Sequence, residues 1–380
     1  MTDFKSKNDA ARGAAGGRLS IRTVFASKDA KGDSVYARNR IPGIVSTSSG
    51  ALLLVHEARR SWEDWAYIDI IVVRSTDGGK TFERPFYICR GVEDGLTANN
   101  AVLIAAGERI HVIYCKKYAV PGLDGSGVFM RTSDDDGCTF GPERDITSAT
   151  RPDIRNVFAT GPGHGIQLFD GTLIVPVWMV LKSAGVEPKE HRPAVVSVLY
   201  SLDGGSTFRL GPIIGDTAQA GDYNETSAVQ LEDGSVMLNI RTGALRDDTG
   251  GYVHPGYCYR SISVSPDGVG GYSAPCLDKN LLDPVCYGST AAYNIEGLPY
   301  GVLFVNCEHP SKRENLVVKL SLDGGRTYPY KRAITTGIAG YADITVAKDG
   351  SIYVFYEEDA GLYLKLARFD LDWLTGGAVK

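Results

Sequence analysis

SLDGGSTF, from Ser201 to Phe208, is one of five copies of a short phrase in this chain of 380 residues. The other copies read STDGGKTF, SDDDGCTF, SPDGVGGY and SLDGGRTY, and they begin at residues 75, 133, 265 and 321. Successive copies, starting at 75, 133, 201, 265 and 321, are therefore spaced by 58, 68, 64 and 56 residues. A nearly constant period of this size indicates a repeat architecture.

The phrase has the chemistry of a tight turn between two strands. Its Asp side chain can accept hydrogen bonds from nearby backbone amides, and the Gly residues tolerate a positive φ. The Thr and the aromatic residue then open the next strand. We therefore interpret these boxes as structural and expect none of their Asp residues to contact a substrate.

The segments between the boxes read as short strands of four to seven residues, rich in Val, Ile, Leu and Tyr and preceded by Gly-containing turns. No amphipathic helix longer than about ten residues is evident. At about 60 residues per unit, residues 20–380 hold six units. The sequence thus predicts an all-β fold: a single domain over 20–380, built as a six-bladed β-propeller of four-stranded antiparallel blades, after a flexible N-terminal segment over 1–19.

The composition limits the possible partners. The net charge is −5 with no long block of one sign, which argues against binding to nucleic acid or to a membrane surface. The seven cysteines form no CxxC pair and the six histidines show no metal-ligand spacing, so we expect neither a metal nor another cofactor. The first 20 residues lack the apolar region of a signal peptide, which predicts a cytoplasmic protein, or a secreted one if a leader has been removed. The oligomeric state stays open.

Polar residues within or beside apolar segments form the candidate site. They come from different repeat units, and a propeller would bring them together near its central axis. The candidates are Arg40, Arg59, Asp64, Glu225, Arg241, Arg313, Tyr341 and Glu357. Glu63 and Asp69 remain alternatives to Asp64, and Arg60 remains an alternative to Arg59.

Several short motifs surround these residues. They are RIP at 40–42, EAR at 57–59 followed by an Asp and by DIIVVRSTDGG, GPGHGIQL at 161–168, NET at 224–226, LNIR at 238–241, REN at 313–315 and the closing LARFDLDWLT. With these motifs the chain resembles the bacterial exo-α-sialidases, or neuraminidases, over residues 36–375. The resemblance implies a sialidase-type catalytic propeller that removes terminal sialic acids from glycoconjugates with retention, so that the expected partner is a sialylated glycan.

The resemblance also implies a role for each candidate. Three arginines would bind the substrate carboxylate, namely Arg40, Arg241 and Arg313. Tyr341 would be the nucleophile, Glu225 its base and Asp64 the general acid and base. Glu357 would hold Arg40, and Arg59 would meet the C4 hydroxyl of the sugar.

Physical chemistry favours these residue types. A sialic acid carries a carboxylate on its anomeric carbon, and the planar guanidinium of arginine matches a carboxylate with two parallel hydrogen bonds. A carboxylate nucleophile would be repelled by that substrate group by roughly 1–4 kcal/mol at ~4 Å. A neutral tyrosine avoids the repulsion, and a carboxylate within hydrogen-bond reach can take its proton.

Some positions depart from the family pattern. Ala342 follows the expected nucleophile where the family usually has Ser, and residues 64–67 read DWAY. Trp62 and Trp65 flank Asp64, and we expect them to exclude water and keep its carboxyl protonated. Residues 97–100 are a weak counterpart of the family's N-acetyl pocket, and His164 is expected to bond to the backbone in a tight turn.

These departures leave the substrate open. The alternatives are a hydrolase or transferase for a related nonulosonic acid, such as the deaminated form, and a non-catalytic sugar-binding propeller.

Overall fold

A computed structural model of the protein describes residues 17–30, 35–117, 126–187, 191–215, 222–243, 245–246, 252–253 and 258–380. Most of the predicted flexible segment 1–19 lies outside these residues. The all-β prediction is confirmed, because strands dominate the described chain and its helices are short. These helices are η1 (Lys28–Ala30), α1 (Gly91–Asp94), η2 (Thr147–Thr150), η3 (Lys182–Ala184) and α2 (Leu371–Thr375).

Four antiparallel sheets follow one another along the chain, and within each sheet the four main strands are paired in chain order. The first contains β2 (Arg38–Ser46), β3 (Leu52–Arg59), β4 (Ile68–Ser75) and β5 (Phe86–Arg90). The second contains β6 (Ala98–Ala106), β7 (Arg109–Lys117), β8 (Ser126–Ser133) and β9 (Arg144–Asp145). The third contains β10 (Arg155–Thr160), β13 (Leu173–Leu181), β14 (Val195–Ser201) and β15 (Arg209–Leu210), and the fourth contains β16 (Tyr223–Gln230), β17 (Val236–Thr242), β20 (Tyr259–Ser265) and β21 (Cys276–Leu282).

Four short strands lie outside this scheme. β11 (Gly163–His164) pairs in parallel with β6, β12 (Ile166–Gln167) pairs with β13, and β18 (Leu245–Arg246) pairs with β19 (Tyr252–Val253).

The last sheet has seven strands in the order β1-β27-β26-β25-β24-β23-β22. Its members are β1 (Ser20–Ala26), β22 (Ser289–Tyr293), β23 (Gly301–Cys307), β24 (Glu314–Ser321), β25 (Tyr330–Val346), β26 (Ile352–Glu358) and β27 (Tyr363–Phe369). The 17-residue strand β25 pairs with β24 over residues 330–338 and with β26 over residues 339–346. The sheet therefore consists of two four-stranded halves that share β25, and β1 completes the second half by pairing with β27.

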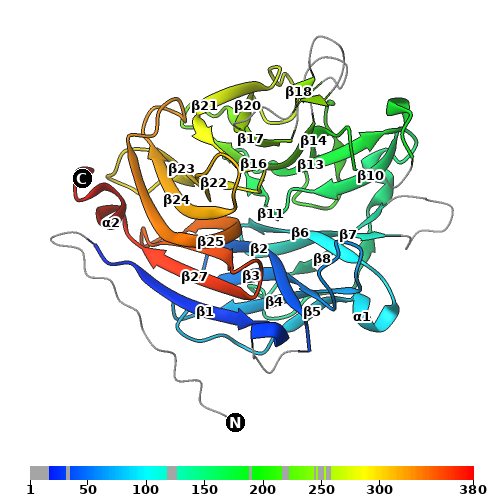
Figure 1. The fold of residues 1–380 in the computed structure, drawn as a ribbon, viewed down its shortest axis with the longest axis horizontal. Coiled ribbons are helices and arrows are strands. Elements are labelled where there is room, and N and C mark those ends of the chain that lie inside the picture. The colour runs from blue at the N-terminus through cyan, green and yellow to red at the C-terminus, as the bar shows by residue number, and fades with distance from the viewer. Residues whose placement is uncertain are drawn as a thin grey trace.

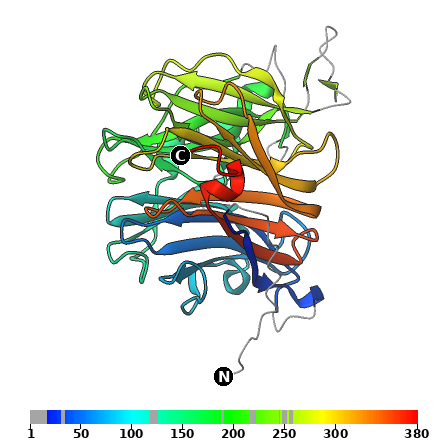
Figure 2. The ribbon, with the colours of Figure 1, turned by 90° about the vertical axis from the view of Figure 1, so that its left-hand side faces the viewer.

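The sheets surround a common centre. Figure 1 shows β2, β6, β11, β16, β22 and β25 near the middle of the view, with β4, β5, β20 and β21 farther out. The N-terminal strand β1, in blue, lies beside the red β27. Figure 2, turned by 90°, shows the strands running from side to side, with α2 on the face toward the viewer.

Apolar side chains fill the spaces between neighbouring sheets. Successive residues of a strand point to opposite faces, so one strand can serve two layers of the core. In β3, Leu53 packs in a cluster with Leu103 of the second sheet, whereas Leu54 packs in a cluster with Phe355 of β26. The first sheet is thereby held between the second sheet and the last one.

A buried carboxylate joins the innermost strands. Asp343 of β25 is fully buried and accepts hydrogen bonds from Ile44 N at 2.7 Å, His164 Nδ1 at 2.8 Å and Ser289 Oγ at 2.5 Å. Burial alone would lower the pKa of His164, but the charge and hydrogen bond of Asp343 outweigh it and raise that pKa. The expectation that His164 bonds to the backbone is therefore wrong, because its partner is a side chain that links four strands.

Each box lies in the turn between the third and fourth strands of a four-stranded unit. In the copy at 75–82, Asp77 accepts hydrogen bonds from the backbone amides of Lys80 and Thr81 and from the hydroxyls of Thr81 and Ser75. Slight burial acts in the opposite direction, but these bonds lower the pKa of Asp77 to about 2. The turn prediction is thus confirmed, and the box Asp residues do not line the pocket described below.

We predict that Asp77→Asn lowers the free energy of unfolding at pH 7 by about 1 kcal/mol, because the ionised acceptor is lost. A pKa lower in the folded than in the unfolded chain contributes stability above about pH 4 that is lost as the pH falls toward the folded value of about 2. The difference between wild type and variant should therefore shrink between pH 4 and pH 2 in urea titrations. Asp134→Asn, which changes an exposed member of an exposed ion pair, is the control. An unchanged difference across this range would contradict the assignment.

Candidate active site

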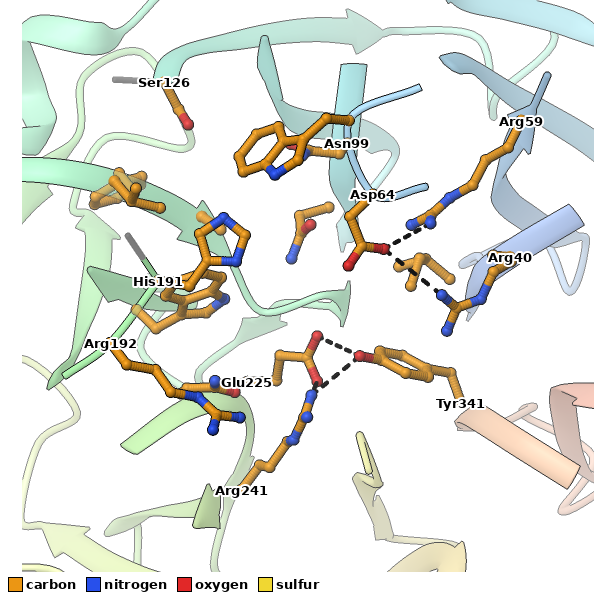
Figure 3. Close-up of a pocket in the computed structure, with 18 of the residues that line it drawn as sticks. Arg40, Arg59, Asp64, Asn99, Ser126, His191, Arg192, Glu225, Arg241 and Tyr341 are labelled. Atoms are coloured by element: carbon orange, nitrogen blue, oxygen red, sulfur yellow. Dashed lines mark hydrogen bonds and ion pairs between the residues drawn. The ribbon is translucent and has the colours of Figure 1, made fainter. Parts of the chain in front are cut away.

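A cavity of about 240 Å³ lies where the innermost strands meet, and seven of the eight candidates line it. These are Arg40, Arg59, Asp64, Glu225, Arg241, Arg313 and Tyr341. Figure 3 shows six of them pointing toward one another, with Arg40, Arg59 and Tyr341 on one side and Glu225 and Arg241 below. The eighth, Glu357, lies behind Arg40.

Glu357 holds Arg40 as expected. Its side chain is 2% exposed, and it accepts from Arg40 Nε at 3.2 Å and from the backbone amide of Ile41 at 2.9 Å. The amide of Tyr341 also approaches it, at 3.4 Å. Burial acts against the charged form of Arg40, but Glu357 and the other nearby acids outweigh it, so its pKa is raised and its charge is secure.

Glu225, Arg241 and Tyr341 form a second buried group. The hydroxyl of Tyr341 donates to Glu225 Oε1 at 2.6 Å, and Arg241 donates to the same hydroxyl at 3.1 Å and to Glu225 Oε2. Burial and the charge of Glu225 raise the pKa of Tyr341, against the opposing charges of the arginines. The phenol is therefore neutral, and Glu225 lies within hydrogen-bond distance of its proton.

Arg313 is the third arginine near Tyr341. Its guanidinium lies 5.4 Å from the centre of the Tyr341 ring, compared with 5.2 Å for that of Arg40. Arg313 Nη2 donates to the carbonyl of Val285 at 3.2 Å, and the ring of Tyr287 stacks on that of Tyr341 with centres 5.9 Å apart. The structure thus brings the three arginines together around one tyrosine.

Arg59 sits at the end of β3 and is almost fully buried. It pairs with Glu57 at 2.6 Å and with Asp64 at 2.7 Å. Arg60, the alternative, points elsewhere, because its guanidinium lies over the ring of Tyr36. Glu63 and Asp69 do not line the pocket, and Asp69 instead accepts from the hydroxyl of Tyr36 and the amide of Val92.

The environment of Asp64 differs from our expectation. Its side chain is 65% exposed, and Trp62 lies over Arg38 rather than over the carboxylate. Partial burial would raise the pKa of Asp64, but the charge and hydrogen bond of Arg59 and the charge of Arg40 hold it below its usual range. The prediction that the two tryptophans exclude water and keep Asp64 protonated is wrong, because Arg59 and Arg40 stabilise the carboxylate.

The wall of the pocket opposite Arg40 and Arg59 was missed in the sequence. It includes Trp178, His191 and Arg192. Asn224 of the NET motif and Asn99 and Asn100 of the weakly predicted segment 97–100 also line the pocket. Figure 3 shows His191 and Arg192 on this side. Both follow a polar stretch with no periodicity, and the sequence carries no signal that would have distinguished them from solvated loop residues.

Among the described residues, no group of three His, Cys, Asp or Glu side chains could hold a metal ion. In the same part of the chain, no helix is long and apolar enough to cross a membrane.

The repeated turns, the four-stranded sheets and the central pocket define an Asp-box β-sheet repeat protein. The family of BNR repeat-like domains matches residues 85–354, and the chain belongs to this family, with sialidases as its relatives. It is 28% identical to a sialidase of Micromonospora viridifaciens over 368 residues, which cover 90% of this chain and 53% of the relative. It is 26% identical to a sialidase of Bacteroides fragilis, covering 86% of this chain and 61% of the relative. The chain thus spans little more than half the length of these two relatives.

Solved structures share the fold. Hadza microbial sialidase Hz136 superposes with a TM-score of 0.75 at 24% identity, covering 90% of this chain and 67% of that one. The intramolecular trans-sialidase from Ruminococcus gnavus superposes with a TM-score of 0.74 at 18% identity, covering 93% of this chain and 98% of that one.

We predict that Glu357→Gln destabilises the protein by about 3 kcal/mol, because the buried charge of Arg40 loses its counter-ion. Chemical denaturation at pH 7 measures this change. Glu83→Gln is the matched control, since Glu83 pairs with Arg74 at 2.6 Å but is half exposed, and it should cost less than about 1 kcal/mol. Equal losses in the two variants would show that Glu357 does not compensate Arg40.

Proposed function

We propose that this protein is a retaining exo-α-sialidase that hydrolyses terminal sialic acids from glycoconjugates. The observation that carries this proposal is the hydrogen bond from the Tyr341 hydroxyl to Glu225, at 2.6 Å, inside a pocket lined by three arginines. The sialidase relatives supply independent support. We also propose that the sheets form a six-bladed propeller, for which the division of the last sheet at β25 provides the fifth and sixth four-stranded units.

The substrate carboxylate would bind at the three arginines. Arg40, Arg241 and Arg313 surround the Tyr341 ring, and each remains charged. A carboxylate there gains several charge-assisted hydrogen bonds and places the attached anomeric carbon next to the phenolic oxygen. This arrangement favours 2-keto sugar acids over neutral sugars.

Tyr341 would attack the anomeric carbon as Glu225 takes its proton. A raised pKa means that the free phenolate is scarce, so proton transfer must accompany attack. The C–O bond from Tyr341 forms while the glycosidic bond breaks, and the leaving oxygen takes a proton from Asp64. Asp64 then removes a proton from water, which attacks the sugar carbon as its bond to Tyr341 breaks. Glu225 returns the proton to the phenol, and the two displacements give net retention.

The exposure of Asp64 fits this second role, because a leaving group and a water molecule can both reach it. Its lowered pKa in the free protein must rise before it can donate a proton. A bound substrate carboxylate would compensate the charge of Arg40, which removes one cause of the lowering. Substrate binding would therefore favour the protonated form.

The same chemistry would serve a related nonulosonic acid or a transferase. The solved relatives include both a sialidase and intramolecular trans-sialidases, so the fold is compatible with either acceptor, water or a sugar hydroxyl. Hydrolysis of fluorogenic N-acetylneuraminic acid beside its deaminated analogue, with the released sugar identified, separates these possibilities. Absence of turnover on every such substrate would favour the non-catalytic alternative.

We expect Tyr341→Phe to reduce kcat by about 10³-fold or more while the fold is retained, because the attacking oxygen is removed and the ring stays. Turnover of the fluorogenic substrate and circular dichroism measure the two effects. Tyr356→Phe is the control, since Tyr356 is a fully buried tyrosine outside the pocket. Labelling of a carboxylate rather than Tyr341 by a 2,3-difluorinated sialic acid would overturn the assignment.

Asp64→Asn should affect natural sialosides far more than the fluorogenic substrate. A sugar leaving group needs a proton, and general acid help contributes roughly 10²–10⁴-fold, whereas an acidic phenol departs with little help. The alkaline limb of kcat for the natural substrate should also disappear in the variant, because that limb reports loss of the acid's proton. Equal losses on both substrates would indicate that Asp64 only shapes its loop, and Glu63→Gln is the matched comparison.

A further inference from the structure

The arginines of the pocket share one construction. Among the described residues five arginines line it, and four of them pair with a carboxylate. The pairs are Arg40 with Glu357, Arg59 with Glu57, Arg241 with Glu225 and Arg192 with Asp222. Arg192 has no role in the proposed mechanism, yet it pairs with a carboxylate as do the arginines that have one.

The carboxylate behind Arg192 is fully buried. Asp222 Oδ2 lies 2.9 Å from Arg192 Nε, and Asp222 Oδ1 accepts from the amide of Ala194 at 3.1 Å. A Cβ on Gly243 would come within 2.3 Å of Asp222 Oδ2, so only glycine leaves room for this carboxylate. Burial raises the pKa of Asp222, although Arg192, the Ala194 amide and Arg241 oppose this effect.

A surface ion pair needs no such support. Arg109 and Asp134 form a pair of similar length, 2.8 Å, with side chains 56% and 71% exposed. Arg192 is 55% exposed, but its partner is 0% exposed. Burying a carboxylate costs free energy that one half-exposed arginine repays poorly. Arg192 approaches Asp222 most closely through Nε, and its half-exposed guanidinium lines the pocket, where it can meet a ligand.

A second observation points to the same wall. The indole nitrogen of Trp178 is buried and has no hydrogen-bond partner within the described chain, and Trp178 lines this pocket. An unpaired buried donor costs about 1–3 kcal/mol, which a bound acceptor would recover. Arg192 and Trp178 both only donate hydrogen bonds, so this wall suits an oxygen acceptor.

We propose that Arg192, held by Asp222, binds an oxygen acceptor on the part of the sugar remote from the anomeric carbon. This inference rests on the proposed function, which places the anomeric carbon beside Tyr341. Figure 3 shows Arg192 and His191 across the pocket from Arg40, Arg59 and Tyr341. Arg192 is then a specificity-determining residue and takes no part in bond breaking.

The acceptor could come from two parts of a sialic acid, the acetamido carbonyl on C5 or the outer hydroxyls of the side chain on C6. Three fluorogenic substrates separate them: N-acetylneuraminic acid, its deaminated analogue and a C7 form shortened by periodate and borohydride. Because Arg192→Met alone would strand the charge of Asp222, the variant to test is the double change Arg192→Met with Asp222→Asn. Arg109→Met is the matched control.

We expect kcat/KM for N-acetylneuraminic acid to fall about 10–100-fold in the double variant, mainly through KM, as for a lost charge-assisted hydrogen bond. For the analogue that lacks the bound acceptor, kcat/KM should fall less than about threefold in the double variant. Which analogue behaves in this way tells which group Arg192 binds. Arg192→Lys should recover only part of the loss, since lysine has no planar fork.

Two results would overturn the inference. One is an unchanged kcat/KM in the double variant, and the other is an equal loss on all three substrates, which would indicate a general disturbance. If the wild-type protein hydrolyses none of them, the proposed function fails. Calorimetric binding of the three free sugar acids to wild type and variant then tests Arg192 without turnover, and equal affinities would reject it.

Discussion

The buried carboxylate of Glu357 fixes the geometry on which the pocket depends. It accepts from the side chain of Arg40 and the amide of Ile41 on β2, and it lies beside the amide of Tyr341 on β25. These contacts set the distance between the guanidinium of Arg40 and the phenol of Tyr341. Glu357 makes them inside the protein, where water does not compete for its hydrogen bonds. A buried carboxylate at this place is stable only because Arg40 neutralises it. The ion pair that balances the charge therefore also fixes the shape of the pocket.

The two acids of the pocket differ because their surroundings differ. Glu225 is buried against Arg241 and Tyr341, whereas Asp64 is mostly exposed and forms an ion pair with Arg59. One environment suits proton exchange with a fixed internal group. The other suits exchange with molecules that enter and leave. A single central pocket therefore holds one enclosed carboxylate and one accessible carboxylate.

Sequence reasoning recovered the parts of the molecule that local chemistry specifies. The box turns follow from Asp and Gly preferences, and charged residues at the ends of apolar strands, such as Arg40 and Arg241, stand out against their neighbours. It could not recover features that arise from contacts between distant segments. Asp343 became a hub only through its place on the innermost strand, and Arg192 acquired its partner Asp222 across a gap of 30 residues. The exposure of Asp64 and the joining of two units by β25 likewise depend on packing that no local pattern encodes.

The pairing of β1 with β27 joins segments from opposite ends of the described chain, and the pair of Arg40 and Glu357 spans 317 residues. Contacts between residues so far apart in sequence form late, because the entropy cost of closing a long loop comes before the free energy that the contact supplies. During synthesis β1 would emerge long before its partner β27, and Arg40 would still lack its counter-ion. The pocket is therefore incomplete until the last strands are made, and the nascent protein would depend on protection of the unpaired β1 until β27 arrives.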